Sequence, residues 1–139
     1  MPRAKVLLAD DEIPFQLAIG DYLRSQYDVD LVEDAEGVKQ KGPAADVLVV
    51  DVRLPTSLCE GIEAVGDLLR QNQIRPTVPI IFISIEAERG ALPVAALRRC
   101  GVPAGRYRWL QKPFELTTLA YLIADEQTRL RPNKGAKSV

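Results

Sequence analysis

Charged and hydroxyl side chains stand at the ends of several short apolar runs. Asp51 follows Val47 to Val50, four apolar residues of which three are β-branched. The construction recurs, with Asp10 and Asp11 after 6–9, Ser84 after 80–83 and Lys112 after 109–111. Three carboxylates brought together cannot all stay ionised and unpaired. Such a cluster predicts a divalent cation, a lysine counter-charge or a raised pKa.

The apolar runs are typical of buried parallel strands, whose carboxyl ends form the crevice where ligands bind. The segment 28–33 alternates polar and apolar residues and predicts a half-exposed edge strand. Helical patterns between the runs complete five strands and five helices, an α/β arrangement with a parallel sheet. The predicted helices cover 12–26, 34–41, 58–71, the second half of 86–100, and 114–130.

The first of these helices carries an apolar stripe and a possible cap. Asp11 precedes it and is a plausible N-cap. The residues expected to face inward are Ile13, Leu17, Ile19, Tyr22 and Leu23.

Length and composition limit the functional classes. The 139 residues are expected to form one domain over 1–130, with 131–139 as a flexible basic tail or the start of a linker. A net charge of −1 gives no footprint for nucleic acid or membrane. With no histidine and with Cys59 and Cys100 far apart, a usual zinc site is excluded, and the cysteines are expected to be small buried apolar residues. No signal peptide or long apolar run is evident, so we expect a cytoplasmic protein.

Taken together, these residues resemble the receiver domain of bacterial two-component response regulators of the chemotaxis-regulator type. The resemblance rests on Asp10-Asp11, Asp51, Ser84 and Lys112-Pro113-Phe114 in register on the β/α alternation, and it covers about residues 5–130. It implies a flavodoxin-like five-stranded parallel sheet of order 2-1-3-4-5 with helices on both faces. The edge strand at 28–33 agrees with that order.

The resemblance also implies roles for the residues. Asp51 would be the phosphoacceptor, Lys112 would pair with the phosphoryl group, and Ser84 would donate its hydroxyl to it. A cis peptide bond is expected before Pro113. The ligands implied for Mg²⁺ are Asp10, Asp11, Asp51 and the backbone carbonyl of Arg53.

Several residues depart from the family pattern. Trp109 stands where the family has a smaller aromatic that moves when the site is occupied, so we expect a biased switch. Ile85 replaces a small residue, and Arg53 and Glu86 could pair as a gate across the mouth. Extra length is expected at 56–59, 90–93 and 101–105, which puts the common dimer surface in doubt.

The leading interpretation is a Mg²⁺-dependent receiver phosphorylated by a histidine kinase or phosphotransfer protein, acting on an output protein or fused domain, with a homodimer possible. It would catalyse only its own phosphorylation and dephosphorylation and turn over no other substrate. The alternative is a pseudo-receiver that binds proteins independently of phosphorylation. A phosphatase normally has a second acid soon after the nucleophile, and Val52-Arg53-Leu54 offers none. Taken singly, Asp11 and Asp51 could also be a helix cap and a turn residue.

Overall fold

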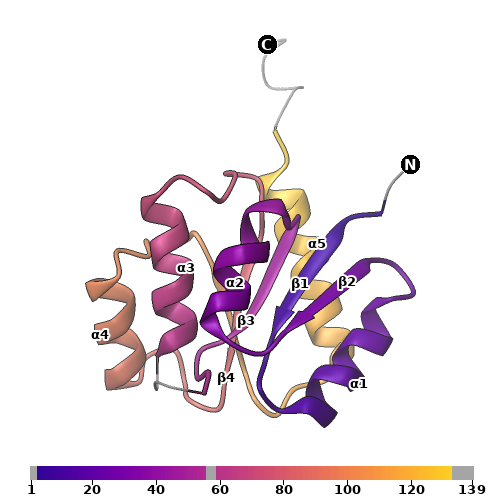
Figure 1. Ribbon diagram of the computed structural model, residues 1–139, viewed down its shortest axis with the longest axis horizontal. Helices are drawn as coiled ribbons and strands as arrows, with labels where there is room; N and C mark the ends of the chain where they lie inside the picture. The colour runs from indigo at the N-terminus through magenta and orange to yellow at the C-terminus, as the bar shows by residue number, and fades with distance from the viewer. Residues whose placement is uncertain (1–2, 56–58, 133–139) are drawn as a thin grey trace.

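One parallel sheet forms the centre of the molecule (Figure 1). The computed structural model describes residues 3–55 and 59–132. The sheet has five strands in the order β2-β1-β3-β4-β5, which confirms the predicted fold. The strands are β1 (Lys5–Ala9), β2 (Asp28–Val32), β3 (Val47–Asp51), β4 (Ile80–Ser84) and β5 (Arg108–Gln111).

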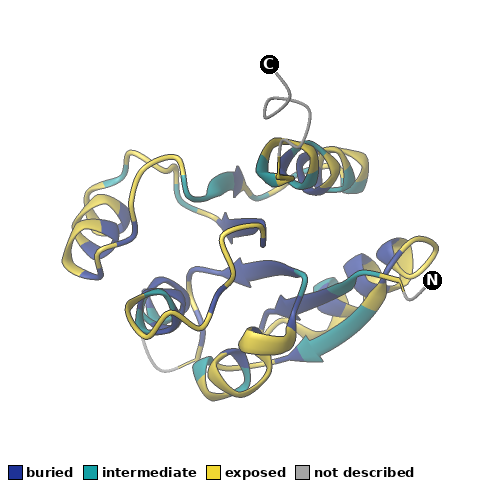
Figure 2. Cartoon of the chain, turned by 90° about the horizontal axis from the view of Figure 1, so that it is seen from above, coloured by how far each residue is buried: buried dark blue, intermediate teal, exposed yellow. Residues whose placement is uncertain are grey.

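Helices cover both faces of the sheet, and its three central strands, β1, β3 and β4, are almost entirely buried (Figure 2). Along β1 and β3, successive side chains enter opposite cores because a strand has a period of two. Val6, Leu8 and Val49 pack with α1 and α5, whereas Leu7 and Leu48 pack with α2, α3 and α4. The helices are α1 (Ile13–Leu23), α2 (Ala35–Lys41), α3 (Glu60–Arg70), α4 (Ala91–Arg99) and α5 (Leu116–Leu130), and a short 3-10 turn, η1 (Gly42–Ala44), follows α2.

The second strand and the helix after it follow the sequence pattern. Strand β2 lies at the sheet edge beside β1, with Asp28 exposed and Val32 buried. Asp34 caps α2 by accepting a hydrogen bond from the Gly37 amide at 2.8 Å. The helix predicted over 34–41 ends as expected at Lys41, where α2 gives way to η1.

The first helix differs from the prediction in its cap and in its buried face. Its N-cap position is Glu12 instead of Asp11, and no side chain caps it. Ile13, Leu17 and Tyr22 are 40%, 47% and 39% exposed, so the predicted inward stripe is wrong for these three residues. The side chains that face the sheet are Gln16, Ile19 and Leu23, with Gly20.

A polar residue accounts for this rotation of α1. The side chain of Gln16 is buried and donates to the backbone carbonyl of Val32 at 2.7 Å. Because this hydrogen bond satisfies the amide, a polar residue can occupy the face that its sequence pattern assigns to solvent.

The remaining local predictions have mixed outcomes. Helix α4 spans Ala91–Arg99, so it includes the expected second half of 86–100 but begins earlier, with Pro93 in its first turn, and the Lys112-Pro113 peptide bond is cis. The side chains of Cys59 and Cys100 are buried, as expected. Of the proposed extra length at 56–59, residues 56–58 lie outside the described residues, as do residues 133–139 of the expected tail. Within 3–55 and 59–132, no helix has the length and apolar character needed to cross a membrane.

Candidate functional site

Three carboxylates gather where β1 and β3 end. The two strands are neighbours, with Ala9 opposite Val50, so the residues that follow them emerge side by side. Oxygen atoms of Asp10, Asp11 and Asp51 lie within 4.8 Å of one another. Asp10 is fully buried and Asp51 is 5% exposed, whereas Asp11 is open to solvent. The structure thus brings the three predicted acids into one cluster.

Lys112 places its ammonium group among these acids. Its Nζ lies 2.8 Å from Asp51 Oδ2, 3.2 Å from Asp10 Oδ2 and 3.1 Å from Glu12 Oε1. An ammonium group has three protons, so three carboxylates satisfy it. The same Nζ lies 4.4 Å from the centre of the Phe15 ring, a cation–π contact.

Sequence reasoning missed two of these contacts, those of Glu12 and Phe15 with Lys112. Glu12 directly follows the acid pair and Phe15 lies one helical turn on, so their position next to Asp11 was the available signal. Neither residue follows a strand directly, so the pattern of polar residues at strand ends does not include them.

The same pattern of hydrogen bonds orients the side chains of Asp10 and Asp51. In each, one carboxylate oxygen accepts a backbone N–H two residues ahead at 2.9 Å, from Glu12 and Arg53 respectively. The other oxygen of each faces Lys112. The two side chains are therefore fixed before any ligand arrives, a form of preorganisation.

Gly61 lets α3 approach the end of β3. A Cβ atom at this position would lie 2.0 Å from the backbone carbonyl oxygen of Asp51. The Gly61 amide also donates to the carbonyl of Val52 at 3.0 Å. The close approach requires a residue with no side chain.

Burial raises the pKa values of the two enclosed acids of the cluster. Burial raises the pKa of Asp51 to about 6, the charge of Asp10 adds to this rise, and the hydrogen bond from Lys112 opposes it. Burial also raises the pKa of Asp10. Burial by itself disfavours the charged form of Lys112, yet its bond to Asp51 and the surrounding carboxylates raise its pKa overall.

Glu86 connects the predicted switch and gate residues. Its backbone N–H donates to Ser84 Oγ at 2.9 Å, and its carbonyl accepts the indole N–H of Trp109 at 3.0 Å. Its carboxylate lies 3.5 Å from an Arg53 guanidinium nitrogen, so the expected pair is formed. Ile85 is 57% exposed at the rim. The role of the Arg53 carbonyl as a metal ligand stays a prediction.

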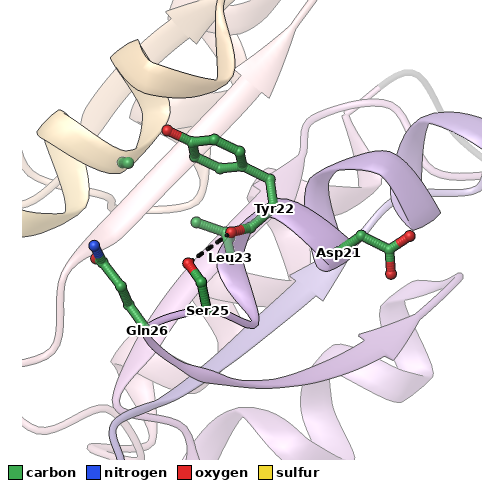
Figure 3. Close-up of a pocket in the computed structure, with 6 residues that line it drawn as sticks. Asp21, Tyr22, Leu23, Ser25 and Gln26 are labelled. Carbon is green, nitrogen blue, oxygen red and sulfur yellow. Dashed lines mark hydrogen bonds between the residues drawn. The ribbon is translucent and has the colours of Figure 1, made fainter.

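A small cavity opens onto the acids, and a larger one lies elsewhere. The cavity at the acids has a volume of about 260 Å³ and is lined by Asp11, Glu12, Asp51, Arg53, Ile85 and Lys112. One of several larger cavities, of about 360 Å³, lies where the end of α1 meets α5, with Tyr22 pointing toward α5 and Asp21 away from it (Figure 3). Its single carboxylate, Asp21, pairs with Arg24 at 3.0 Å. Size therefore does not identify the reactive site, and the acid cluster does.

Comparisons with known proteins agree with this geometry. The family model for the response regulator receiver domain matches residues 6–124. The DNA-binding transcriptional regulator NtrC of Rhizobium meliloti is 30% identical over 96% of this chain and 26% of its own length. A protein-glutamate methylesterase/protein-glutamine glutaminase of Syntrophomonas wolfei is 26% identical over 76% of this chain and 32% of its own length. The chain thus spans about a third or less of these relatives.

Solved structures show the same fold. The Vibrio cholerae chemotaxis protein CheY4 is 27% identical, covers 88% of this chain with 98% of its own, and superposes with a TM-score of 0.72. The match of the family model spans most of the sequence and includes every member of the acid cluster and Lys112. This chain therefore belongs to the response regulator receiver domain family of two-component signalling systems.

Proposed function

We propose that this domain accepts a phosphoryl group on Asp51 in a Mg²⁺-dependent reaction. The observation that carries the proposal is the buried Asp51 carboxylate, fixed within a cluster of three acids and 2.8 Å from the Lys112 ammonium. A nucleophile, a neighbouring positive charge and oxygen ligands for a cation are the parts that phosphoryl transfer needs.

In the proposed step, a carboxylate oxygen of Asp51 attacks the phosphorus of a phosphohistidine. The new bond is an acyl phosphate, and the breaking P–N bond leaves its electron pair on the imidazole. That imidazole belongs to a partner, because this chain has no histidine. Lys112 would then pair with the phosphoryl oxygens, and the Ser84 hydroxyl would donate to one of them.

The acid cluster fits a magnesium ion. Its donors are all carboxylate oxygens, and Asp11 is exposed, which leaves room for the waters that Mg²⁺ keeps. Asp10, Asp11, Asp51 and the Arg53 carbonyl would hold the ion. When bound, it would supply positive charge that neutralises the incoming phosphoryl oxygens.

The rim residues would set the speed and readout of the reaction. Ile85 would narrow access to the acyl phosphate for donors and water, and the Arg53–Glu86 pair would act as a gate. Trp109 would respond to phosphorylation of Asp51, because its indole donates a hydrogen bond to Glu86, whose amide donates to the Ser84 hydroxyl.

The proposed partners follow from this reaction. A histidine kinase or phosphotransfer protein would supply the phosphoryl group. An output protein or fused domain would read it, as the names of the relatives suggest, one a DNA-binding regulator and the other a methylesterase. The proposed location is cytoplasmic, and a homodimer is a possible assembly. The domain would modify only itself.

A second candidate function is a pseudo-receiver that binds partners without phosphorylation. The observation that favours it is the rim of the cavity, which is lined by Ile85 and by Arg53, the partner of Glu86 in an ion pair. Phosphoryl uptake distinguishes the two functions.

The test is intact-protein mass spectrometry after incubation with Mg²⁺ and a small acyl-phosphate donor. We expect one added phosphoryl group, no addition with EDTA, and no addition in Asp51→Asn. Asp28→Asn, which changes an exposed aspartate at the start of β2, serves as the matched control and should react like the parent. An unmodified parent protein that is correctly folded would establish the pseudo-receiver instead.

A further inference from the structure

Three side chains on one side of β5 hold the segment that follows β4. Trp109 and Gln111 lie in β5 and Tyr107 directly precedes it; the three alternate along the chain, so they project to the same side. Two of them pack on Phe82 of β4, with ring centres 5.5 Å away for Tyr107 and 6.0 Å for Trp109. Tyr107 and Trp109 therefore anchor this stretch of the chain in the core next to β4.

Tyr107, Trp109 and Gln111 each donate a hydrogen bond to residues 85–88. The Gln111 amide donates to the Ile85 carbonyl at 3.3 Å, and the Trp109 indole donates to the Glu86 carbonyl at 3.0 Å. The Tyr107 hydroxyl donates to the Glu88 carboxylate at 3.0 Å. The receiver resemblance concerns Trp109 and assigns no role to Tyr107 or Gln111.

The 85–88 segment also determines where the Ser84 hydroxyl lies. Ser84 Oγ accepts the Glu86 amide at 2.9 Å, and the Lys112 amide in turn donates to the Ser84 carbonyl. If Ser84 moves to reach a phosphoryl group on Asp51 and keeps its hydrogen bond to the Glu86 amide, Glu86 moves with it. Every contact that ties residues 85–88 to β5 then opposes that movement.

We propose that Tyr107 is a positioning residue: its hydrogen bond to Glu88 holds the 85–88 segment, and through it the Ser84 hydroxyl, in the arrangement of the unphosphorylated site. This inference rests on the proposed phosphoryl site and adds a regulator of it. A ligand shifts a conformational equilibrium only by its differential affinity for the two states. Weakening the Tyr107 contact should therefore strengthen the binding of a phosphoryl mimic.

The chemistry of the contact suits this role. Burial and the hydrogen bond to the Glu88 carboxylate raise the pKa of Tyr107 to about 12, so the phenol stays protonated and remains a donor at neutral pH. Its acceptor is charged, which makes the bond stronger than one between neutral groups.

The test compares Tyr107→Phe with the parent protein by calorimetric titration of beryllofluoride in saturating Mg²⁺. Removing the hydroxyl should tighten binding by roughly three- to tenfold, the range expected for one hydrogen bond. Tyr121→Phe is the matched control, since Tyr121 on α5 is 64% exposed and its change should have no effect. The affinity for Mg²⁺ alone should be the same in all three proteins, because the acid cluster is untouched.

A second variant keeps the test decisive if Tyr107→Phe folds poorly. Glu88→Ala removes the acceptor and should tighten binding equally, and the double variant should add little, as expected for two partners of one contact. A purely structural role would lower the thermal midpoint and leave the beryllofluoride affinity unchanged.

The outcomes separate this inference from the proposed function. Failure of the parent protein to bind beryllofluoride would refute both. Binding by the parent, with Tyr107→Phe binding equally or more weakly, would leave the phosphoryl site standing and overturn the role of Tyr107.

Discussion

Buried or half-buried aspartates at the two ends of the sheet have pKa values that are shifted in opposite directions. At the carboxyl ends of the strands, Asp51 shares one lysine with Asp10, and burial raises its pKa to about 6. At the opposite end, Asp46 accepts the Lys5 amide at 2.8 Å and the Arg75 guanidinium at 3.0 Å. Burial opposes its ionisation, but these bonds lower the pKa of Asp46 overall.

The difference separates an acid that holds the fold together from an acid held ready for a ligand. Asp46 has a donor for each oxygen and gains nothing from a cation. Asp51 is ionised in a buried site that already holds the negative charge of Asp10, so a bound cation would lower the cost of its ionisation. A raised pKa beside other acids is therefore the clearer sign of a functional site than burial alone.

The largest effect should follow from removing the charge of Lys112. Lys112→Met leaves the apolar stem and deletes the ammonium that faces Asp51. We expect the rate of phosphoryl uptake from a small donor to fall by about 10²-fold, the loss typical of one preorganised electrostatic contact. Mass spectrometry over a time course measures this rate. Lys39→Met, which breaks the exposed pair between α2 and Asp67 of α3, is the control, and an equal loss there would contradict a site-specific role.

The pH dependence of stability should distinguish the two aspartates directly. Because the pKa of Asp51 is higher in the folded state, its ionisation costs stability as pH rises from about 4 to about 6. Asp51→Asn should therefore be more stable than the parent at pH 7, by about 1–3 kcal/mol, and this advantage should shrink as pH falls below 6.

Asp46 should behave in the opposite sense. Its lowered pKa means that its ionised form stabilises the fold above the unfolded value of 3.8, and that this contribution is lost as pH falls further. Asp46→Asn should be less stable than the parent at pH 7, with the gap closing in acid. Urea unfolding with EDTA measures both variants. If both substitutions changed the free energy of unfolding at pH 7 in the same direction, the contrast between the two aspartates would be wrong.

The smallest effect is expected at the gate. The Arg53–Glu86 pair is partly exposed, and such pairs contribute about 0–1 kcal/mol. Arg53→Ala should change the rate of phosphorylation or dephosphorylation by no more than roughly fivefold. Arg24→Ala removes a comparable exposed pair on α1 and should leave both rates unchanged. Identical rates for the two variants would remove the gate hypothesis.

Much of this molecule follows from short-range patterns. Runs of β-branched and apolar residues indicated the buried strands, alternation at 28–33 indicated the edge, and Asp34 marked a helix start. Acids that follow parallel strands must share one edge of the sheet, so the meeting of Asp10 and Asp51 could be anticipated before any coordinates.

Other features depend on contacts between distant segments. The phase of α1 was predicted wrongly because Leu17 and Tyr22 fit the helical stripe, while the packing of Gln16 against Val32 decided which side faces the sheet. The pairing of Glu12 with Lys112 spans 100 residues and leaves no local pattern. The contact between Tyr107 and Glu88 depends on where the loop after β4 passes β5.

The sequence by itself determined the order of the elements and the residue types at the strand ends, because periodicity and turn chemistry act over a few neighbours. Only the tertiary structure decided which groups share Lys112, how far burial raises the pKa of Asp51, and which β5 side chains hold residues 85–88. Those properties depend on distances between segments and on exclusion of water, and both arise only when the layers pack.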